Sequence, residues 1–156
     1  MVALSKVRTC LWFEKGGLDA ALFYVSLLPD SHLESEYAAR PEEEPLTVEF
    51  MLAGAPYQIL NGGPNYKLTP AASISVLTED QEETDRLWKS LLADGGEENR
   101  CAWLTDRFGV SWQIVPKALW RAVTATDQVA AERARQAMFK MRKIDIAEIE
   151  NAFHNK

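Results

Sequence analysis

The fold of this 156-residue chain is decided by two stretches that match each other, Gly54-Ala55-Pro56-Tyr57-Gln58-Ile59-Leu60 and Gly109-Val110-Ser111-Trp112-Gln113-Ile114-Val115. They align at a shift of 55 residues, and a shift of 64 aligns residues 9–28 with 73–92. The two shifts differ where the first copy carries an extra acidic loop, 38–45. A constant offset within each block is typical of a duplicated module. The sequence therefore predicts two related halves.

Each half shows the same order of patterns. Strands are predicted at 7–14, 46–52 and 56–60 in the first half and at 72–77, 100–105 and 110–115 in the second, and 32–37 fits a further short strand. A helix closed by Pro29 is expected to pack through one face, formed by Leu18, Ala21, Leu22, Val25 and Leu28. The second helix follows a capping box with Thr78 as the cap and Gln81 reaching back, and it buries Thr84, Leu87, Trp88, Leu91 and Leu92. These patterns predict an α+β fold of two βαβββ modules.

Composition excludes several classes of protein. With 47% hydrophobic and 26% charged residues the chain is typical of a globular protein, and a net charge of −6 disfavours nucleic acid as a partner. No apolar run reaches the ~18–20 residues that cross a bilayer, and no signal peptide begins the chain, so no membrane partner and a cytoplasmic location are expected. Cys10 and Cys101 stand far apart without metal-binding spacing, which favours two reduced thiols.

We predict one domain at 1–116, with modules at about 7–61 and 71–116, and a helical extension of the same domain at 117–156. In the extension, Ala130, Ala134, Ala137, Met138 and Met141 share a helical stripe, and Asp145 with Glu148 fits the cap of a last helix. Two interpretations are weighed equally. The helices either close one end of the domain or form an arm that docks on a second subunit and covers exposed sheet edges.

Several motifs resemble one known family. They are Cys10-Leu11-Trp12-Phe13, Phe23-Tyr24, Asn61-Gly62-Gly63-Pro64, Trp103-Leu104-x-Asp106-x-Phe108-Gly109-x-x-Trp112-Gln113-x-x-Pro116, and Met141-x-Lys143-Ile144-Asp145-Ile146. The sequence resembles the PhnB-like branch of the vicinal oxygen chelate superfamily, which includes glyoxalase I, extradiol dioxygenases and the fosfomycin- and bleomycin-resistance proteins. The resemblance implies paired modules whose sheets curl around an open cavity, commonly in a homodimer.

Some members of this branch are labelled 3-demethylubiquinone-9 3-methyltransferases. A nucleotide-like methyl donor usually needs a glycine-rich strand-to-helix turn followed by an acidic ribose partner. The pairs Gly16-Gly17 and Gly95-Gly96 lack that spacing and are explained as turns. The sequence therefore gives the label no support.

In metal-dependent relatives, the first and last strands of each module supply His and Glu ligands. The resemblance places the corresponding positions near Thr9 and Gln58 in the first half and Ser73 and Gln113 in the second, with Cys10 one residue away from the first of them. Neutral amides and hydroxyls are poor ligands for a transition metal, and neither His32 nor His154 completes a cluster. No metal and no cofactor are therefore expected, and catalytic residues stay unassigned.

Gln58 and Gln113 occupy equivalent positions and can orient a small molecule through their amides. The candidate ligand-binding residues are Thr9, Trp12, Gln58, Ser73, Ser75, Trp103 and Gln113. The tryptophans Trp12, Trp103 and Trp112 could supply stacking surface, but core filling is the favoured interpretation for all three. Glu49 and Asp106 are explained as structural acids. The leading hypothesis is a homodimeric small-molecule-binding protein without the usual metal ligands. The alternatives are an enzyme of the same superfamily (a lyase, a dioxygenase-like catalyst or the methyltransferase of the label) and a structural dimer with a collapsed cavity.

Overall fold

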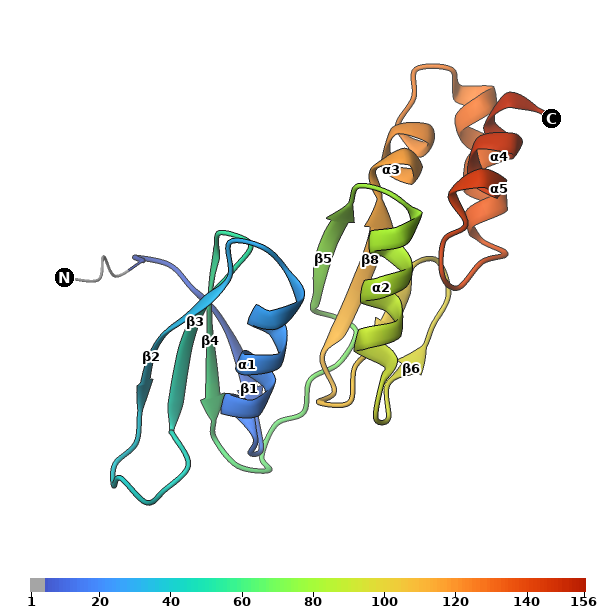
Figure 1. Ribbon diagram of the computed structural model, residues 1–156. Coiled ribbons are helices and arrows are strands. Elements are labelled where there is room, and N and C mark those ends of the chain that lie inside the picture. Colours follow the sequence, from blue (N-terminus) through green and yellow to red (C-terminus); the bar gives the residue numbers. More distant parts are fainter. Residues whose placement is uncertain (1–4) are drawn as a thin grey trace. The chain divides into compact units, whose positions relative to one another are not determined.

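The computed structural model describes residues 5–156, which divide after Leu68 into two compact units, here called the N-terminal unit and the C-terminal unit (Figure 1). The N-terminal unit contains β1 (Thr9–Phe13), α1 (Gly17–Leu27), β2 (His32–Tyr37), β3 (Thr47–Leu52) and β4 (Ala55–Asn61). Its sheet has the order β1-β4-β3-β2, in which only the β1–β4 pair is parallel.

The C-terminal unit repeats this plan. It contains β5 (Ser73–Thr78), α2 (Gln81–Leu92), β6 (Glu97–Glu98), β7 (Trp103–Thr105) and β8 (Ser111–Pro116), followed by α3 (Lys117–Val123), α4 (Gln128–Met138) and α5 (Ile146–His154). The sheet order is β5-β8-β7-β6, with a parallel β5–β8 pair. The α+β class and the two βαβββ modules are confirmed. None of the helices within residues 5–156 is long and apolar enough to span a bilayer.

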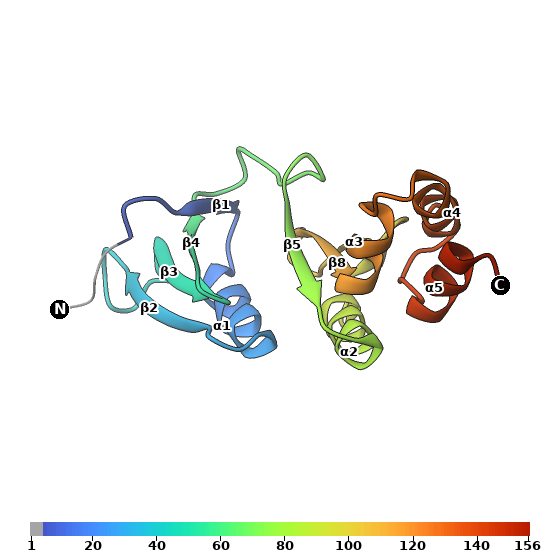
Figure 2. The ribbon, with the colours of Figure 1, turned by 90° about the horizontal axis from the view of Figure 1, so that it is seen from above.

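Helix α1 packs on one face of the first sheet, as Figure 2 shows from above. The expected contact face was only partly right, because Ala21 is buried but Leu22 is 47% exposed. The buried residues of the helix are Gly17, Ala20, Ala21, Tyr24 and Leu27. A Cβ on Gly17 would lie 2.4 Å from Ile59 Cγ2, so the close approach at this glycine sets the rotation of the helix.

Helix α2 begins differently from the predicted capping box. Asp80, not Thr78, is the N-cap, and its side chain accepts a hydrogen bond from the Glu83 backbone N–H at 2.9 Å. Thr78 is fully buried, and its hydroxyl lies 2.6 Å from the Thr84 hydroxyl, a pair that ties β5 to the helix. The buried face itself is as predicted for Thr84, Leu87, Trp88 and Leu91, whereas Leu92 is half-buried.

The strand predicted at 100–105 is shorter in the structure. Cys101 and Ala102 have left-handed φ angles of 56° and 74°, so regular pairing starts only at Trp103. The backbone N–H groups of both residues donate instead to the carbonyls of Met141 and Arg142, each at 2.9 Å. The extension thus accepts the N–H groups of this segment, whereas the Ala102 carbonyl still accepts from the Ile114 N–H of β8 at 2.8 Å.

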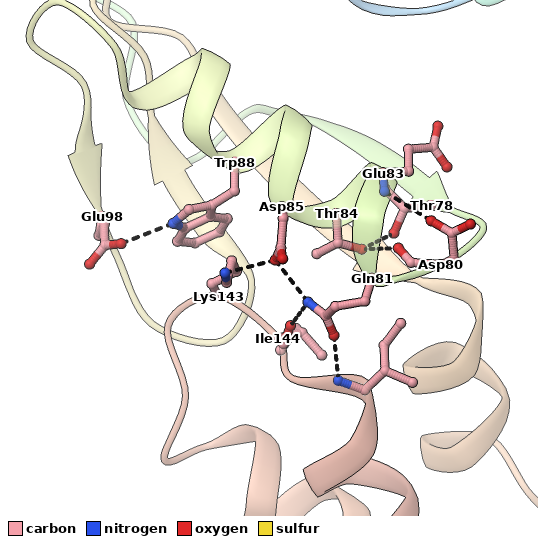
Figure 3. A network of polar contacts seen from close by, with 11 residues as sticks. Thr78, Asp80, Gln81, Glu83, Thr84, Asp85, Trp88, Glu98, Lys143 and Ile144 are labelled. Carbon is pink, nitrogen blue, oxygen red and sulfur yellow. Dashed lines mark hydrogen bonds and ion pairs between the residues drawn. The ribbon is translucent and has the colours of Figure 1, made fainter.

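The extension has three helices where two were expected, since α3 was not predicted. Its core consists of Ala102, Leu119, Ala122, Ala134, Met141, Ile144 and Ile149. Figure 3 shows how it is fastened to α2. Gln81 donates to the Ile144 carbonyl at 3.0 Å and accepts from the Ile146 N–H at 2.9 Å. Asp145 caps α5 by accepting from the Glu148 N–H, which confirms that predicted cap.

Candidate functional site

Each sheet has one face covered by its helix, and the opposite face carries the polar side chains. In β1, Leu11 and Phe13 are buried on the side of α1, and Cys10 and Trp12 alternate to the other side. Because paired residues of neighbouring strands point to the same face, Gln58 joins Cys10 on that open face. The candidate site of the N-terminal unit therefore lies on the face away from α1.

A row of four residues crosses the open face, one from each strand. The register places Cys10 opposite Gln58, Gln58 opposite Glu49, and Glu49 opposite Ser35, and we call these four residues the Glu49 row. Gln58 Nε2 donates to Glu49 Oε1 at 3.3 Å, and Ser35 Oγ donates to Glu49 Oε2 at 3.0 Å. One carboxylate therefore organises the polar groups of the row.

The parallel register separates Thr9 from this row. Thr9 pairs with Tyr57, whose alternating position belongs to the face of Ile59, so Cys10 occupies the position opposite Gln58. The Cys10 side chain is exposed, yet partial desolvation raises the pKa of its thiol above the ordinary value. At neutral pH this thiol keeps its proton and acts as a weak hydrogen-bond donor. The role predicted for Thr9 in ligand binding stays a prediction.

Trp12 lies on the open face two residues beyond Cys10, and its indole is fixed by contacts with residues 62–66. Its Nε1 donates to the Gly63 carbonyl at 2.9 Å, and its ring meets Tyr66 edge-on with centroids 4.9 Å apart. A Cβ on Gly62 would come within 2.4 Å of the indole, so this loop position requires glycine. Trp12 therefore presents a fixed aromatic surface, still partly exposed, beside the row.

Arg8, the basic residue nearest in sequence to Cys10 of the row, already forms an ion pair. Arg8 contacts Glu34 at 2.5 Å, and the two side chains are 10% and 7% exposed. Arg8 also donates to the Tyr57 carbonyl at 3.2 Å. The Arg8 charge is thus matched by a carboxylate, whereas Glu49 forms no ion pair with any Lys, Arg or His side chain within residues 5–156.

The C-terminal unit presents a related set on the face away from α2. Ser75 and Trp103 both pair with Gln113, whose Nε2 donates to Ser73 Oγ at 2.9 Å. Ser73 lies two residues before Ser75 and therefore points to the same face. The structure thus brings four predicted residues of this half together: Ser73, Ser75, Trp103 and Gln113.

The remaining candidates have structural roles. Trp112 is 1% exposed and donates through Nε1 to Asp106 Oδ2 at 2.8 Å. Asp106 also accepts from the backbone N–H groups of Phe108 and Val110 at 2.8 and 3.0 Å, as expected for an acid at a turn. His32 and His154 are exposed. The prediction that Trp112 and Asp106 serve the structure is confirmed.

Two members of the row were not among the predicted site residues. Ser35 was not considered, and Glu49 was set aside because it alternates away from Val48 and Phe50. That same alternation places it beside Gln58 on the open face. The sequence could have predicted this pair. A two-residue turn at Ala53 and Gly54 fixes the register of the β3–β4 hairpin and so places Glu49 opposite Gln58.

A divalent metal of the kind found in related proteins does not fit these donors. The strand pairs that correspond to the ligand positions are Cys10 with Gln58 and Ser75 with Gln113. Hydroxyl and amide groups bind transition metals weakly, and only the thiolate form of cysteine is a ligand, which the raised pKa of Cys10 opposes. Within residues 5–156, no three or more His, Cys, Asp or Glu side chains are grouped so that they would hold an ion.

A nucleotide-like methyl donor does not fit the turn before α1 either. Gly16 N–H donates to Glu44 Oε1 at 2.5 Å, and Gly17 N–H donates to Asn61 Oδ1 at 3.0 Å. Two backbone donors at this helix N-terminus are therefore already bonded to side chains of the chain itself, where an anionic group would need them.

Comparison with known proteins agrees with this architecture. A PhnB protein from Bacillus cereus is 30% identical, with a TM-score of 0.63 over 72% of this chain and 99% of that one. A Pseudomonas aeruginosa protein is 21% identical, with a TM-score of 0.58 over 72% and 98%. FosX, a fosfomycin resistance protein from Listeria monocytogenes solved with Mn(II) and a dihydroxypropylphosphonic acid, is 15% identical, with a TM-score of 0.52 over 74% and 92%. A search of curated proteins found no match.

The fold is thus that of the vicinal oxygen chelate proteins, as the resemblance implied. The profile of the family described as 3-demethylubiquinone-9 3-methyltransferase matches residues 5–115. The chain belongs to this family, whose PhnB-type members share its two modules. The match ends before α3, so the three-helix extension lies beyond the part of the chain that defines the family.

Proposed function

We propose that this protein binds a small organic molecule on the open faces of its sheets without the usual metal ligands of its superfamily. The observation that carries the proposal is the Glu49 row, in which Ser35, Glu49 and Gln58 are hydrogen-bonded, beside the fixed aromatic surface of Trp12. Ligand sites typically combine an apolar or aromatic lining with a small number of polar groups. The set around Gln113 in the C-terminal unit gives further support.

Elemental analysis combined with native mass spectrometry of gently purified protein tests this proposal. A bound organic molecule without a stoichiometric transition metal is the expected result. The double variant Gln58→Leu/Gln113→Leu is expected to lose that molecule and to keep its circular dichroism spectrum. Gln136→Leu is the matched control, because within residues 5–156 the Gln136 side chain bonds only to the exposed Glu132 on the same helix. Retention of the molecule by the double variant would remove both glutamines from the site.

A second candidate function, an enzyme of the same superfamily, is favoured by the position of Glu49. Its carboxylate is bonded to Gln58 and adjoins the open face, where it can accept a proton from a bound molecule. The test is incubation of the protein with its co-purified molecule, followed by mass spectrometry. A change in mass that the wild type produces and Glu49→Gln does not produce identifies turnover, whereas unchanged ligand in both leaves binding as the function.

We also propose that the protein works as a homodimer in the cytoplasm. Strands β1 and β2 are the edges of one sheet and β5 and β6 of the other, and such edges invite pairing or cover by another chain. Exposed apolar side chains on the extension, Trp120, Val129 and Phe139, add surface suited to an interface. Light scattering coupled to gel filtration is expected to give twice the 17.5 kDa chain mass, and a monomer mass would contradict the proposal.

A further inference from the structure

The hydrogen-bond polarity of the Glu49 row indicates which ligands it accepts. A carboxylate only accepts hydrogen bonds, so the Gln58 side chain must turn its NH2 group toward Glu49. The Gln58 carbonyl oxygen, Oε1, receives no hydrogen bond from any other residue in the part of the chain described. The row therefore offers acceptors to a ligand: this carbonyl oxygen and the remaining lone pairs of the Glu49 carboxylate.

Donors are scarce in the same row. Ser35 Oγ gives its only hydrogen to Glu49, and one N–H of Gln58 is used in the same way. The second N–H of Gln58 and the Cys10 thiol remain, and a thiol is a weak donor. A phosphonate or carboxylate ligand needs several strong donors or a cation, and the Arg8 guanidinium is engaged by Glu34.

The aromatic surface beside the row suits a flat ring or a cation. Trp12 is pinned by its bond to the Gly63 carbonyl and by the edge-on contact with Tyr66. Residues two apart on a strand lie roughly 7 Å from each other on the same face. A ring placed against Trp12 therefore lies on the same face as Gln58, the strand neighbour of Cys10, and a substituent of the ring can point along this face toward the acceptors of the row. Indole rings also attract cations through their faces.

We propose that the ligand of the N-terminal unit is a flat organic molecule that carries a cationic or multiply N–H-donating group, such as an amine, amidine or protonated nitrogen heterocycle, and not an organic anion. This inference rests on the proposed function, because it assumes that the row is a ligand site. The inferred ligand charge is opposite to that of the phosphonic acid with which the structural relative FosX was solved.

The test uses two probes of nearly equal shape and opposite charge, benzamidinium and benzoate, titrated into 15N-labelled full-length protein. Benzamidinium is expected to shift the side-chain amide signal of Gln58 and to bind about tenfold more tightly than benzoate, since hydrogen bonds to a charged group are among the stronger ones. Glu49→Gln is expected to reduce benzamidinium binding about tenfold and to leave benzoate binding no weaker.

Two further variants control the result. Glu36→Gln makes the same change in net charge at an exposed residue of β2 and is expected to alter neither affinity. Ser35→Ala removes one hydrogen bond to Glu49 but keeps its charge, so the preference for benzamidinium is expected to persist even if the row loosens. Equal or stronger binding of benzoate by the wild type, or no response of Gln58 to about 10 mM benzamidinium, a concentration at which affinities near 1 mM saturate, would overturn the inference.

The two proposals fail in different ways. If the purified protein carries an organic anion that Gln58→Leu/Gln113→Leu loses, the protein is a ligand-binding protein and only the inferred charge of the ligand is wrong. If no molecule is retained and neither probe shifts the Gln58 signal, the site itself is wrong.

Discussion

Replacing Asp106 by Asn is expected to destabilise the C-terminal unit strongly although it preserves the shape of the side chain. Asp106 is 3% exposed, and its Oδ1 accepts from the backbone N–H groups of Phe108 and Val110 while Oδ2 accepts from Trp112 Nε1. An amide can keep its oxygen toward the two backbone groups. Its NH2 group then faces the indole N–H, so two donors meet and the buried indole N–H loses its partner.

The size of the effect follows from these three bonds. A stranded buried donor costs about 1–3 kcal/mol, and bonds to a neutral acceptor are weaker than bonds to a charged one by about 1 kcal/mol each. Relief from burying a charge offsets part of this loss. We expect the free energy of unfolding to fall by about 2–3 kcal/mol, a large share of the 5–15 kcal/mol typical of a folded domain.

Urea denaturation followed by circular dichroism measures this loss, and a double-mutant cycle assigns it. Trp112→Phe is destabilising by itself, because it removes part of a buried ring. It also removes the indole donor, so adding Asp106→Asn to it is expected to cost about 1–2 kcal/mol less than in the wild type. The reasoning is refuted if Asp106→Asn alone lowers the free energy of unfolding by less than about 0.5 kcal/mol, or if the two losses simply add.

Two other predictions concern the join between α2 and the extension. Gln81→Leu removes the bonds to the Ile144 carbonyl and the Ile146 N–H, so it is expected to cost about 1–2 kcal/mol and to speed hydrogen exchange of the Ile146 amide, whereas Gln136→Leu is expected to change stability by less than about 0.5 kcal/mol. Hydrogen bonds from Lys143 and Gln81 lower the pKa of Asp85 below 3.8, so the stability it contributes is fully present above pH 3.8 and is lost as the pH falls through the lowered pKa. Asp85→Asn is therefore expected to flatten the fall of thermal stability below about pH 4, and an unchanged acid profile would contradict this assignment.

The sequence was most informative where local patterns repeat. The match of the stretches at Gly54 and Gly109 predicted two modules, and the Asp145 cap and the buried face of α2 followed from side-chain spacing. It was least informative where distant segments decide the outcome. The rotation of α1 depends on how closely Gly17 approaches Ile59, and nearly every position of that helix is apolar enough to have served as the contact face.

Polar contacts between distant segments could not be predicted from the local sequence patterns either. Thr78-Glu79-Asp80-Gln81 satisfies the rule for a capping box, yet Gln81 bonds to backbone groups more than 60 residues away, and Asp80 is left to cap the helix. A side chain that satisfies a local motif can be drawn into a stronger tertiary role. Helix α3 was missed because its seven residues are too few for a clear periodic signal.

Gln58 and Gln113 occupy equivalent positions in the two modules but have different neighbours. The two-residue turn at Ala53-Gly54 places Glu49 opposite Gln58, whereas in the second copy the residue opposite Gln113 on the neighbouring antiparallel strand is Trp103. On the parallel side, Cys10 stands beside Gln58 and Ser75 beside Gln113. The Gln58 amide therefore donates to a carboxylate, whereas the Gln113 amide donates to the hydroxyl of Ser73 and has a tryptophan as its antiparallel neighbour. The repeat fixes the backbone positions of the two glutamines, but the side chains around them can differ. Equivalent positions in the sequence are therefore not equivalent in chemistry. Gln58→Leu and Gln113→Leu should accordingly be measured separately as well as together.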